Sequence, residues 1–374
     1  MDNESRAPLG ATAPQPPKPP KKANWIRRHK KLAIILGIVL VLLLAGGGYA
    51  AWYFLLKPDA EPVKTQTVKK PAVVKPAEKF YGALTGIEVA DKAAVSALTT
   101  GVMIENSPDA RPQSGLKNSG VVFEAIAEGG ITRFLVLYQT EKPQMIGPVR
   151  SVRLYDVDWL RPFNAGLAHV GGSAEALTEI RNGNYRDFDQ FFNSGSYWRA
   201  TDRFAPHNVY TNFENLDALN AAKGYTDSVF TGFTRKDSAA VKTPTASSLD
   251  VTISSYLYNS TYVYNAESNT YDRFQGGEAH LDREDGQISP RVVIVLKVNQ
   301  ETILQDGYRE KITTIGDGQA YIFQDGAVTE ATWHKSSIEA QMTFTDVAGK
   351  DVPLARGQTW ITAVPNDTGG VRWQ

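Results

Sequence analysis

One apolar stretch stands out from the otherwise mixed pattern of the chain, since the 25 residues 32–56 carry no formal charge. As a helix they would span roughly 37 Å, enough to cross the hydrocarbon core of a bilayer, which is about 30 Å thick. The basic run 27–31 precedes the stretch and predicts a cytoplasmic N-terminus. A cleaved signal peptide would have a shorter apolar core and a small-residue cleavage site, whereas this stretch ends in Trp52–Leu56. We therefore expect one membrane-spanning helix over residues 32–56.

Residues 80–235 mix strand and helix patterns. The β-rich runs Val121–Ala127 and Ile131–Tyr138 are separated by Glu128-Gly129-Gly130, which is a hairpin signal. Helices are predicted at Arg153–Leu160 and Ser173–Arg181, with a buried strand between them at Ala165–Val170. Ser173 is the expected N-cap of the second helix and Gly183 its stop signal. This pattern predicts an α/β domain.

Residues 236–250 have the composition of a linker, and the pattern after them is strand after strand. Tyr256 and Tyr258 alternate with other residues before an Asn259-Ser260 turn, and Tyr262 and Tyr264 alternate after it. Further strands are predicted at Arg291–Val298, Ala320–Gln324, Ala327–Trp333 and, as the last one, Thr359–Val364. Asp325-Gly326 is the signal for a tight hairpin turn. We expect a β-rich C-terminal domain over residues 251–374.

Charge divides the chain differently. Residues 1–31 are rich in proline and carry a net charge of +6, which predicts an unfolded cytoplasmic tail. Residues 57–79 are rich in lysine and proline, carry +3 and predict an extended stalk. Because the whole chain has no net charge, −9 remains for residues 80–374, which argues against a nucleic-acid partner. The chain has no cysteine, which excludes disulfides, thiolate chemistry and a lipidated cysteine.

Arginine is concentrated in the first half of the predicted ectodomain. Residues 101–210 contain nine arginines and two lysines. Arginine is preferred where a planar fork holds a carboxylate or phosphate, and Arg111, Arg150 and Arg153 lie in irregular stretches that suit such a site. The alternative is that the arginines form internal ion pairs with the acids Glu105, Glu124, Glu128 and Asp202.

A glycine-containing turn, His169 to Glu175, joins a predicted buried strand to a predicted helix. Free N–H groups and the helix dipole would make Gly171, Gly172 and Ser173 a possible anion site. A plain capped strand-to-helix turn explains the same residues.

Catalytic patterns are few. Glu105, Glu124 and Glu128 could supply a general acid and base, but they could equally neutralise the arginines. The chain contains neither G-x-S-x-G nor H-E-x-x-H. His280-Leu281-Asp282 could place two metal ligands on one strand face, but a zinc site needs a third. We expect no metal and no cofactor.

Short motifs extend over about residues 80–365. In the first half they are 103–106, 110–116, 122–124, 128–134, 147–153, 169–173 and 205–208. In the second half they are 271–273, 280–282, 316–318, 332–335 and 357–361. Together they resemble the YerB-like family, two-part bacterial proteins described as lipoproteins of unknown function.

This resemblance implies an α/β (α+β) sandwich-like N-terminal ectodomain, a β-rich C-terminal domain and a place on the outer surface of the cell. It implies no established reaction. The chain departs from the family in having an apolar helix in place of a lipidated cysteine, and in having Glu105 where an aspartate is expected.

Two functions remain open at this point. The first is a membrane-anchored envelope protein whose partners are the membrane and a wall polymer or envelope protein. It would bind an anionic or glycan-containing wall component through Arg111, Arg133, Arg150, Arg153, Gly171, Gly172, Ser173, His207 and Asn208. The second is a glycan-active hydrolase or transglycosylase-like enzyme with Glu124 or Glu128 as acid and base, assisted by His169.

Overall fold

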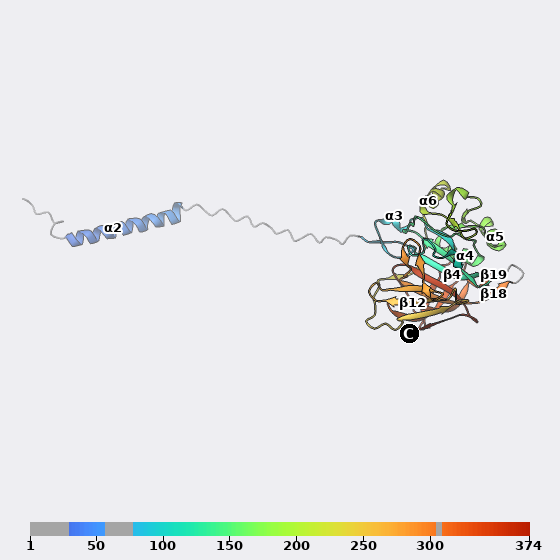
Figure 1. Cartoon of the computed structure of the whole chain (residues 1–374). Coiled ribbons are helices and arrows are strands. Elements are labelled where there is room, and N and C mark those ends of the chain that lie inside the picture. Colours follow the sequence, from blue (N-terminus) through green and yellow to red (C-terminus); the bar gives the residue numbers. More distant parts are fainter. Residues whose placement is uncertain (1–29, 57–77, 304–308) are drawn as a thin grey trace, which may run out of the picture. The chain divides into compact units, whose positions relative to one another are not determined.

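The computed structural model describes residues 30–56, 78–303 and 309–374, so most of the predicted tail and stalk lies outside the described residues. The chain divides into two units, residues 1–76 and residues 77–374. The first unit contains the helix α2, Lys30–Ala51, which continues as a π-helix at Trp52–Leu56 (Figure 1). This helix is long and apolar enough to cross a membrane, and none of its most apolar window is buried. The expectation of a helix over 32–56 is confirmed, while its membrane crossing stays a prediction.

A twelve-stranded mixed sheet lies at the centre of the second unit. Ten of its strands follow one another across the sheet in the order β22 (Thr343–Asp346), β21 (Ala327–Lys335), β20 (Gly316–Gln324), β17 (Val292–Val298), β24 (Thr359–Pro365), β4 (Val121–Glu128), β5 (Ile131–Tyr138), β3 (Thr100–Glu105), β6 (Gly166–His169) and β7 (Arg186–Asp189). The remaining two are β19 (Arg309–Ile312), which pairs with β4, and β18 (Gln300–Ile303), which pairs with β19.

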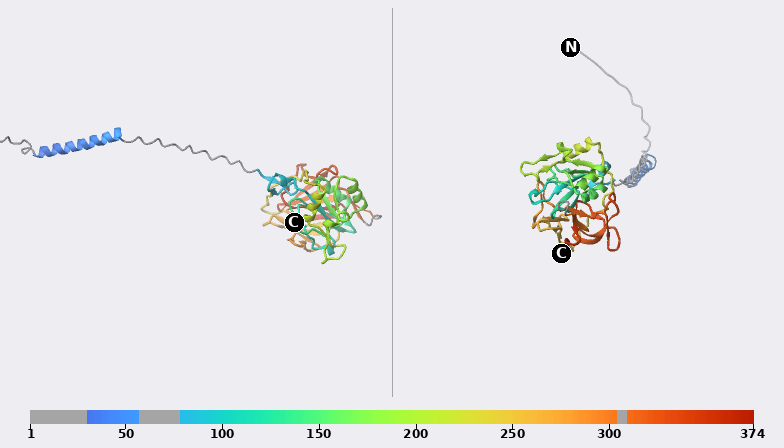
Figure 2. Two further views of the ribbon diagram at one scale, coloured as in Figure 1. Left: turned by 90° about the horizontal axis from the view of Figure 1, so that it is seen from above. Right: turned by 90° about the vertical axis from the view of Figure 1, so that its right-hand side faces the viewer.

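The two halves of the chain share this sheet. The first five strands in the order come from the C-terminal half and the other five from the N-terminal half. They meet where β24 runs parallel to both β17 and β4, with Thr359 opposite Val121 and Thr362 opposite Glu124. The views in Figure 2 show the two halves, coloured cyan to green and orange to red, side by side in one body.

A second sheet covers one face of the central sheet. Its strands, in order, are β14 (Glu278–Ala279), β13 (Thr270–Gln275), β12 (Ser260–Asn265), β11 (Ser248–Thr252) and β25 (Gly370–Trp373). Val122 and Phe134 of the central sheet belong to the same buried cluster as Leu249 and Tyr262 of the second sheet. The helix α6, Phe213–Ala222, adds Phe213 to this cluster. The packing of sheet on sheet gives this side a sandwich-like form.

Helices cover part of the other face of the central sheet. They are α4, Leu154–Leu160, and α5, Ala174–Asn182. Trp159 of α4 stacks on Phe123 of β4 with ring centroids 5.3 Å apart. Ile180 of α5 joins the same cluster. The fold is therefore mixed α/β and strand-rich, as expected in its coarse features.

The remaining elements are short. They are the helix α3 (Lys92–Val95), 3₁₀ turns at Pro108–Ala110, Arg161–Phe163 and Ser194–Ser196, and four two-stranded ladders. The ladders pair β1 (Phe80–Tyr81) with β2 (Glu88–Val89), β8 (Trp198–Arg199) with β9 (Val209–Tyr210), β10 (Arg235–Lys236) with β23 (Leu354–Ala355), and β15 (Leu281–Asp282) with β16 (Gly286–Gln287).

The local predictions succeed where the signals are strong. The two hairpins form at 121–138 and 316–335, and the second turns through Asp325 and Gly326, whose φ angles are 59° and 79°. Ser173 caps α5, because its Oγ accepts a hydrogen bond from the N–H of Ala176 at 3.3 Å.

Two strand predictions are wrong. Tyr256 and Tyr258 lie in a turn, in which Oδ1 of Asn259 accepts hydrogen bonds from the N–H groups of Ile253 and Ser254. The strand at 359 is also not the last, because β25 follows it and pairs with β11. Side-chain alternation alone did not distinguish the tyrosine turn from a strand.

Candidate functional site

Glu128, at the end of β4, is held between two arginines. Its Oε1 lies 2.8 Å from Nη2 of Arg133, and its Oε2 accepts a hydrogen bond from Arg153. Both arginine side chains are almost fully buried. Burial by itself would raise the pKa of Glu128, but the charges of Arg133 and Arg153 lower it below its ordinary value. The carboxylate is therefore ionised at neutral pH and does not suit the role of general acid.

Glu105 forms a second cluster with Arg150 and His207. Its buried carboxylate lies 3.3 Å from Nε of Arg150, and accepts hydrogen bonds from Ser107 at 2.8 Å and from Nδ1 of His207 at 2.9 Å. Because a carboxylate only accepts, Nδ1 of His207 carries a proton, and Nε2 lies 3.9 Å from Oδ2 of Asp109. His207 lines a pocket of about 720 Å³ together with Asp109, Pro112, Asp202, Arg203, Phe204, Ala205 and Arg283.

Glu124 lies on the opposite face of β4 and is fully buried. Its Oε2 accepts hydrogen bonds from Nη2 of Arg273 at 2.9 Å and from Nε1 of Trp360 at 3.0 Å. Oε1 accepts from Thr132 at 3.2 Å. The carboxylate therefore links the two halves of the chain, and it does not lie beside Glu128 in a common site.

His169 is also fully buried. Its Nδ1 lies 2.8 Å from the carbonyl oxygen of Gly171, and its Nε2 lies 3.0 Å from Oδ1 of Asp187. Both of these neighbours are hydrogen-bond acceptors. Burial would raise the pKa of Asp187, but the hydrogen bond and charge of His169 lower it. His169 thus ties β6 to β7.

The glycines of the turn are explained largely by packing. The N–H of Gly171 donates to Oδ1 of Asp189 at 3.1 Å. A Cβ at Gly172 would lie 2.7 Å from Cγ1 of Val152. Asn208 is likewise engaged within its own loop, because its Oδ1 accepts from Arg199 at 2.7 Å.

The turn nevertheless lies beside the predicted arginines. The N–H of Val170 donates to the carbonyl of Arg150, the N–H of Val152 to that of Gly171, and the N–H of Ser173 to that of Val152. The segments 150–152 and 170–173 therefore run side by side. The structure brings Glu128, Arg133, Arg153 and Ser173 together, whereas Arg111 and His207 line other pockets.

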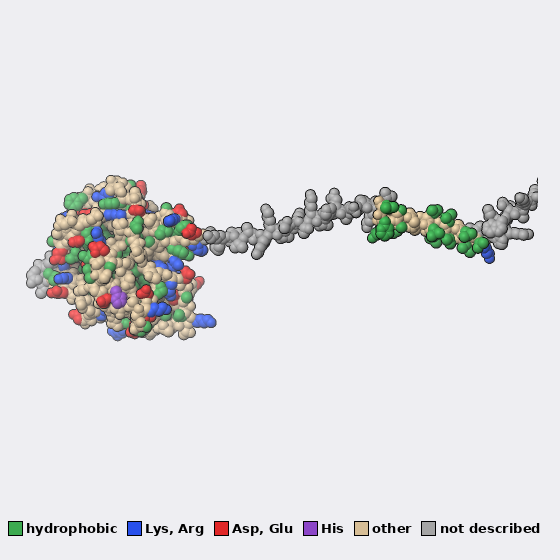
Figure 3. Space-filling view, turned by 180° about the vertical axis from the view of Figure 1, so that it is seen from behind, with side chains coloured by type: hydrophobic (Ala, Val, Ile, Leu, Met, Phe, Trp, Pro, Cys, Tyr) green, Lys and Arg blue, Asp and Glu red, His purple; other side chains and the backbone are tan. Residues whose placement is uncertain are grey.

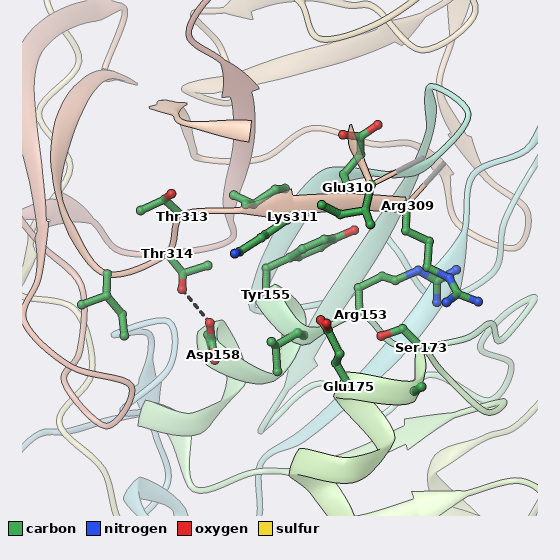
Figure 4. A pocket seen from close by; sticks show the side chains of 15 residues that line it. Arg153, Tyr155, Asp158, Ser173, Glu175, Arg309, Glu310, Lys311, Thr313 and Thr314 are labelled. Atoms are coloured by element: carbon green, nitrogen blue, oxygen red, sulfur yellow. Dashed lines mark hydrogen bonds between the residues drawn. The ribbon is translucent and has the colours of Figure 1, made fainter. Parts of the chain in front are cut away.

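A pocket of about 630 Å³ opens at this junction. Arg153 and Ser173 line it from the N-terminal half, and Arg309 and Lys311 line it from β19 of the C-terminal half. Figure 4 shows the guanidinium groups of Arg153 and Arg309 reaching toward the Ser173 end of α5. The other lining residues are Leu154, Tyr155, Asp158, Ala174, Glu175, Ile303, Glu310, Ile312, Thr313, Thr314 and Ile315.

Acidic side chains complete the pocket. Oδ2 of Asp158 accepts a hydrogen bond from Thr314 at 2.6 Å (Figure 4). Burial raises the pKa of Asp158, although this hydrogen bond opposes the shift. The pocket thus offers cationic groups beside Ser173 and a carboxyl group farther along α4, and isoleucine side chains also line it.

Sequence reasoning missed Arg309 and Lys311. Their spacing of two residues places them on one face of a strand, which was the available signal. Nothing in the sequence showed that this strand pairs with β4, where Arg309 lies opposite Glu128.

Metal ligation finds little support in the described ranges. No group of three or more His, Asp and Glu side chains is placed to hold a metal ion in residues 30–56, 78–303 and 309–374. In the motif 280–282, His280 is buried, receives a hydrogen bond from Arg273 at Nδ1 and donates from Nε2 to Gln113 at 3.1 Å. Burial lowers the pKa of His280 well below its ordinary value, and both of its nitrogens are occupied.

The fold and pocket define a class of strand-rich α/β protein in which two halves share one sheet and together line a polar pocket. Comparison with family models identifies the family to which the chain belongs. The N-terminal domain described as "Protein of unknown function (DUF3048)" matches residues 84–226, and the C-terminal domain of the same description matches residues 249–361. The chain belongs to the DUF3048 family, and the resemblance to YerB-like proteins is confirmed.

Comparisons with the sequence and the crystal structure of a Bacillus subtilis protein agree with this assignment. The chain is 32% identical over 308 residues to the protein named "Putative lipoprotein YerB" of strain 168, covering 80% of this chain and 90% of that one. The crystal structure of YerB from Bacillus subtilis is similar with a TM-score of 0.70 and 28% identity, covering 79% of this chain and all of that one.

Proposed function

We propose that this chain is a membrane-anchored cell-envelope protein that binds an anionic, glycan-containing wall component. The apolar helix α2 supports the anchor, as does the lipoprotein description carried by the Bacillus relative. A helix in one relative and a lipid in another would serve the same purpose of holding the globular unit at a membrane.

One observation carries the binding proposal. Arg153, which directly precedes α4, and Arg309 from β19 meet beside Ser173, at the N-terminal end of α5, in a pocket that both halves of the chain line. Two guanidinium groups and a helix N-terminus together favour a phosphate or carboxylate. Lys311 adds a third cation to the same wall.

The rest of the pocket favours a glycan as carrier of that anion. Asp158 and Glu175 can accept hydrogen bonds from sugar hydroxyl groups. Ile303, Ile312 and Ile315 offer apolar surface to the C–H faces of a ring. On the face drawn in Figure 3, basic and acidic side chains are interspersed and form no broad basic surface.

The hydrolase alternative has less support. Glu124 is buried against Arg273, and Glu128 is ionised between Arg133 and Arg153. The lowered pKa of Glu128 does not suit a general acid near neutral pH, and Glu124 is fully buried. A binding function requires only what the pocket already offers.

The test uses the full-length protein in maltoside micelles, sedimented with purified cell wall. Arg309→Gln and Lys311→Glu should each weaken association by about tenfold or more, because a charge-assisted contact contributes roughly 1.5–3 kcal/mol. Arg372→Gln, on an exposed position of β25, is the matched control and should bind as the wild type does. Unchanged sedimentation of both pocket variants would contradict the proposal, and release of soluble wall fragments that Glu128→Gln abolishes would favour the enzyme.

Orientation is tested separately. A reporter that is active only outside the cytoplasm, fused after Gln374, should be active. Protease added to intact protoplasts should digest the globular unit and spare the N-terminal tail. A fully protected chain would contradict the proposed orientation.

A further inference from the structure

Arg111 lies in a different pocket from the one described above. This second pocket has a volume of about 450 Å³ and shares no lining residue with the pocket around Arg153. Both halves of the chain again contribute to it. The N-terminal half supplies Pro108, Arg111 and Pro112, and the C-terminal half supplies Leu257, Gln275, Gly276, Glu278, Ala279, His280 and Leu281.

The guanidinium of Arg111 has only neutral partners. Its Nε donates to Oδ1 of Asn106 at 3.2 Å, and its Nη2 donates to the carbonyl oxygen of Asn106 at 2.9 Å. Its terminal carbon lies 5.3 Å from the ring centroid of Tyr258. Within the described residues no carboxylate lies within 4.0 Å of it, unlike Arg133, Arg150 and Arg153.

The charges behind the pocket leave this cation uncompensated. Glu124 and Arg273 neutralise each other as a fully buried pair. His280 accepts from Arg273 at one nitrogen and donates to Gln113 from the other, so its ring is neutral. Burial lowers the pKa of Arg111, which means that its charged form is held at a cost that a bound anion would remove.

Besides Arg111, the pocket lining includes large apolar side chains and one acidic residue, Glu278. Leu257 and Leu281 are 48% and 42% exposed although both are large apolar side chains. Both leucines line the pocket, together with the small residues Gly276 and Ala279. Glu278, also at the pocket, repels a second negative charge on a ligand.

We infer that the Arg111 pocket binds a monocarboxylate that carries a short apolar group, with the carboxylate on Arg111 and the apolar group against the exposed side chains of Leu257 and Leu281. Such a group occurs in a free organic acid and at the end of a peptide that terminates in a small apolar residue. The site is independent of the wall-component pocket, so its failure and the failure of that proposal are separate results.

The experiment titrates the full-length protein in maltoside micelles by calorimetry, and follows the Nε–H resonances of labelled arginine. The probes are acetate, butyrate, N-acetylalanine, the tetrapeptide N-acetyl-tetra-alanine, the neutral N-acetylalanine amide and inorganic phosphate. Butyrate and N-acetylalanine should bind saturably, the amide should not, and phosphate should bind more weakly. Arg111→Gln should weaken binding about tenfold or more, while Arg372→Gln should leave it unchanged.

A second variant keeps the test valid if Arg111→Gln does not fold. Leu281→Asn should remove the preference for butyrate over acetate while acetate still binds. Tighter binding of the tetrapeptide than of butyrate would assign the site to peptide ends, and the reverse order to free acids. Equal binding of the acid and its amide, of phosphate and butyrate, or of the wild type and a folded Arg111→Gln protein would overturn the inference.

Discussion

Glu128 shows how one carboxyl group can hold a local structure together without acting on a ligand. It is the counter-ion of both Arg133 and Arg153, whose side chains are 4% and 7% exposed. Removing this one carboxylate leaves two buried arginines without a counter-ion.

Glu128→Gln should therefore lower the free energy of unfolding by about 3–5 kcal/mol at neutral pH. Because the pKa of Glu128 is lowered in the fold, its carboxylate stabilises the folded protein at pH values above the unfolded pKa of 4.5. This stabilisation is lost as the pH falls through the pKa of the folded state. The deficit of the variant should shrink below about pH 4.5 when melting temperatures are compared across pH. Glu267→Gln, at an exposed position, is the control, and a deficit that does not change with pH would contradict this account.

Asp156 titrates in the opposite sense. Burial raises its pKa to about 7, although its carboxylate accepts a hydrogen bond from the backbone N–H of Arg153 at 2.8 Å. A carboxyl group whose pKa is raised in the fold stabilises the protein fully below its unfolded pKa of 3.8. This stabilisation is lost as the pH rises through the pKa of the folded state.

Asp156→Asn keeps an acceptor for the Arg153 N–H and does not titrate. Its stability relative to the wild type should rise between pH 4 and pH 8, by on the order of 1 kcal/mol or more in the free energy of unfolding. Melting temperatures of both proteins measured across this range would show the rise. The exposed Asp227→Asn should show no such trend. A constant difference across this range would mean that Asp156 is not protonated in the fold.

The residue types of the charged clusters were readable from the sequence, but their partners were not. Both interpretations of the arginines were open, because spacing along the chain does not say which acid lies next to which arginine. Arg133 and Arg153 pair with Glu128, while Arg111 has no acidic partner within the described residues. Strand register and packing decide this, and they depend on residues far away in the sequence.

At the scale of elements, the turn before α5 separates a packing role from a binding role. Gly172→Val should cost about 1–3 kcal/mol, because its side chain meets Val152. Ser173→Ala should cost about 0.5–2 kcal/mol through the lost cap. Thermal melting measures both, and Gly195→Val, where nothing lies within 4 Å of an added Cβ, is the control. Full stability of Gly172→Val with loss of wall binding would instead favour a ligand at the glycine.

Elements with strong local signals were predicted from the sequence. Asp325-Gly326 specifies its turn through two positive φ angles, and Ser173 specifies a helix start. The local sequence signal was weak for elements whose secondary structure depends on tertiary contacts. Tyr256 has the alternation of a strand but lies in a turn, and the short β25 is a strand because β11 offers it a pairing edge.

At the scale of the molecule, the fully buried pair Glu124 and Arg273 joins the two halves. Arg273→Met should lower stability by about 3–5 kcal/mol, because Glu124 is left without its cation. Adding Glu124→Gln should recover part of this loss, since an amide in place of the carboxylate removes the buried charge. Chemical denaturation of both proteins measures the coupling, and a double variant less stable than the single one would contradict it.

The shared sheet also sets when the protein can first fold. β24 lies between β17 and β4 at the middle of the sheet, yet in chain order it comes after the other strands that the described residues contribute to this sheet. Until they emerge, β4 and β17 each lack a neighbour, and the N-terminal half has an open, hydrogen-bonding strand edge. A chain that stops before Thr359 would lose a central strand of the sheet. Products that stop just before β24 should therefore be as aggregation-prone as short ones, and the growing chain needs protection until β24 has emerged.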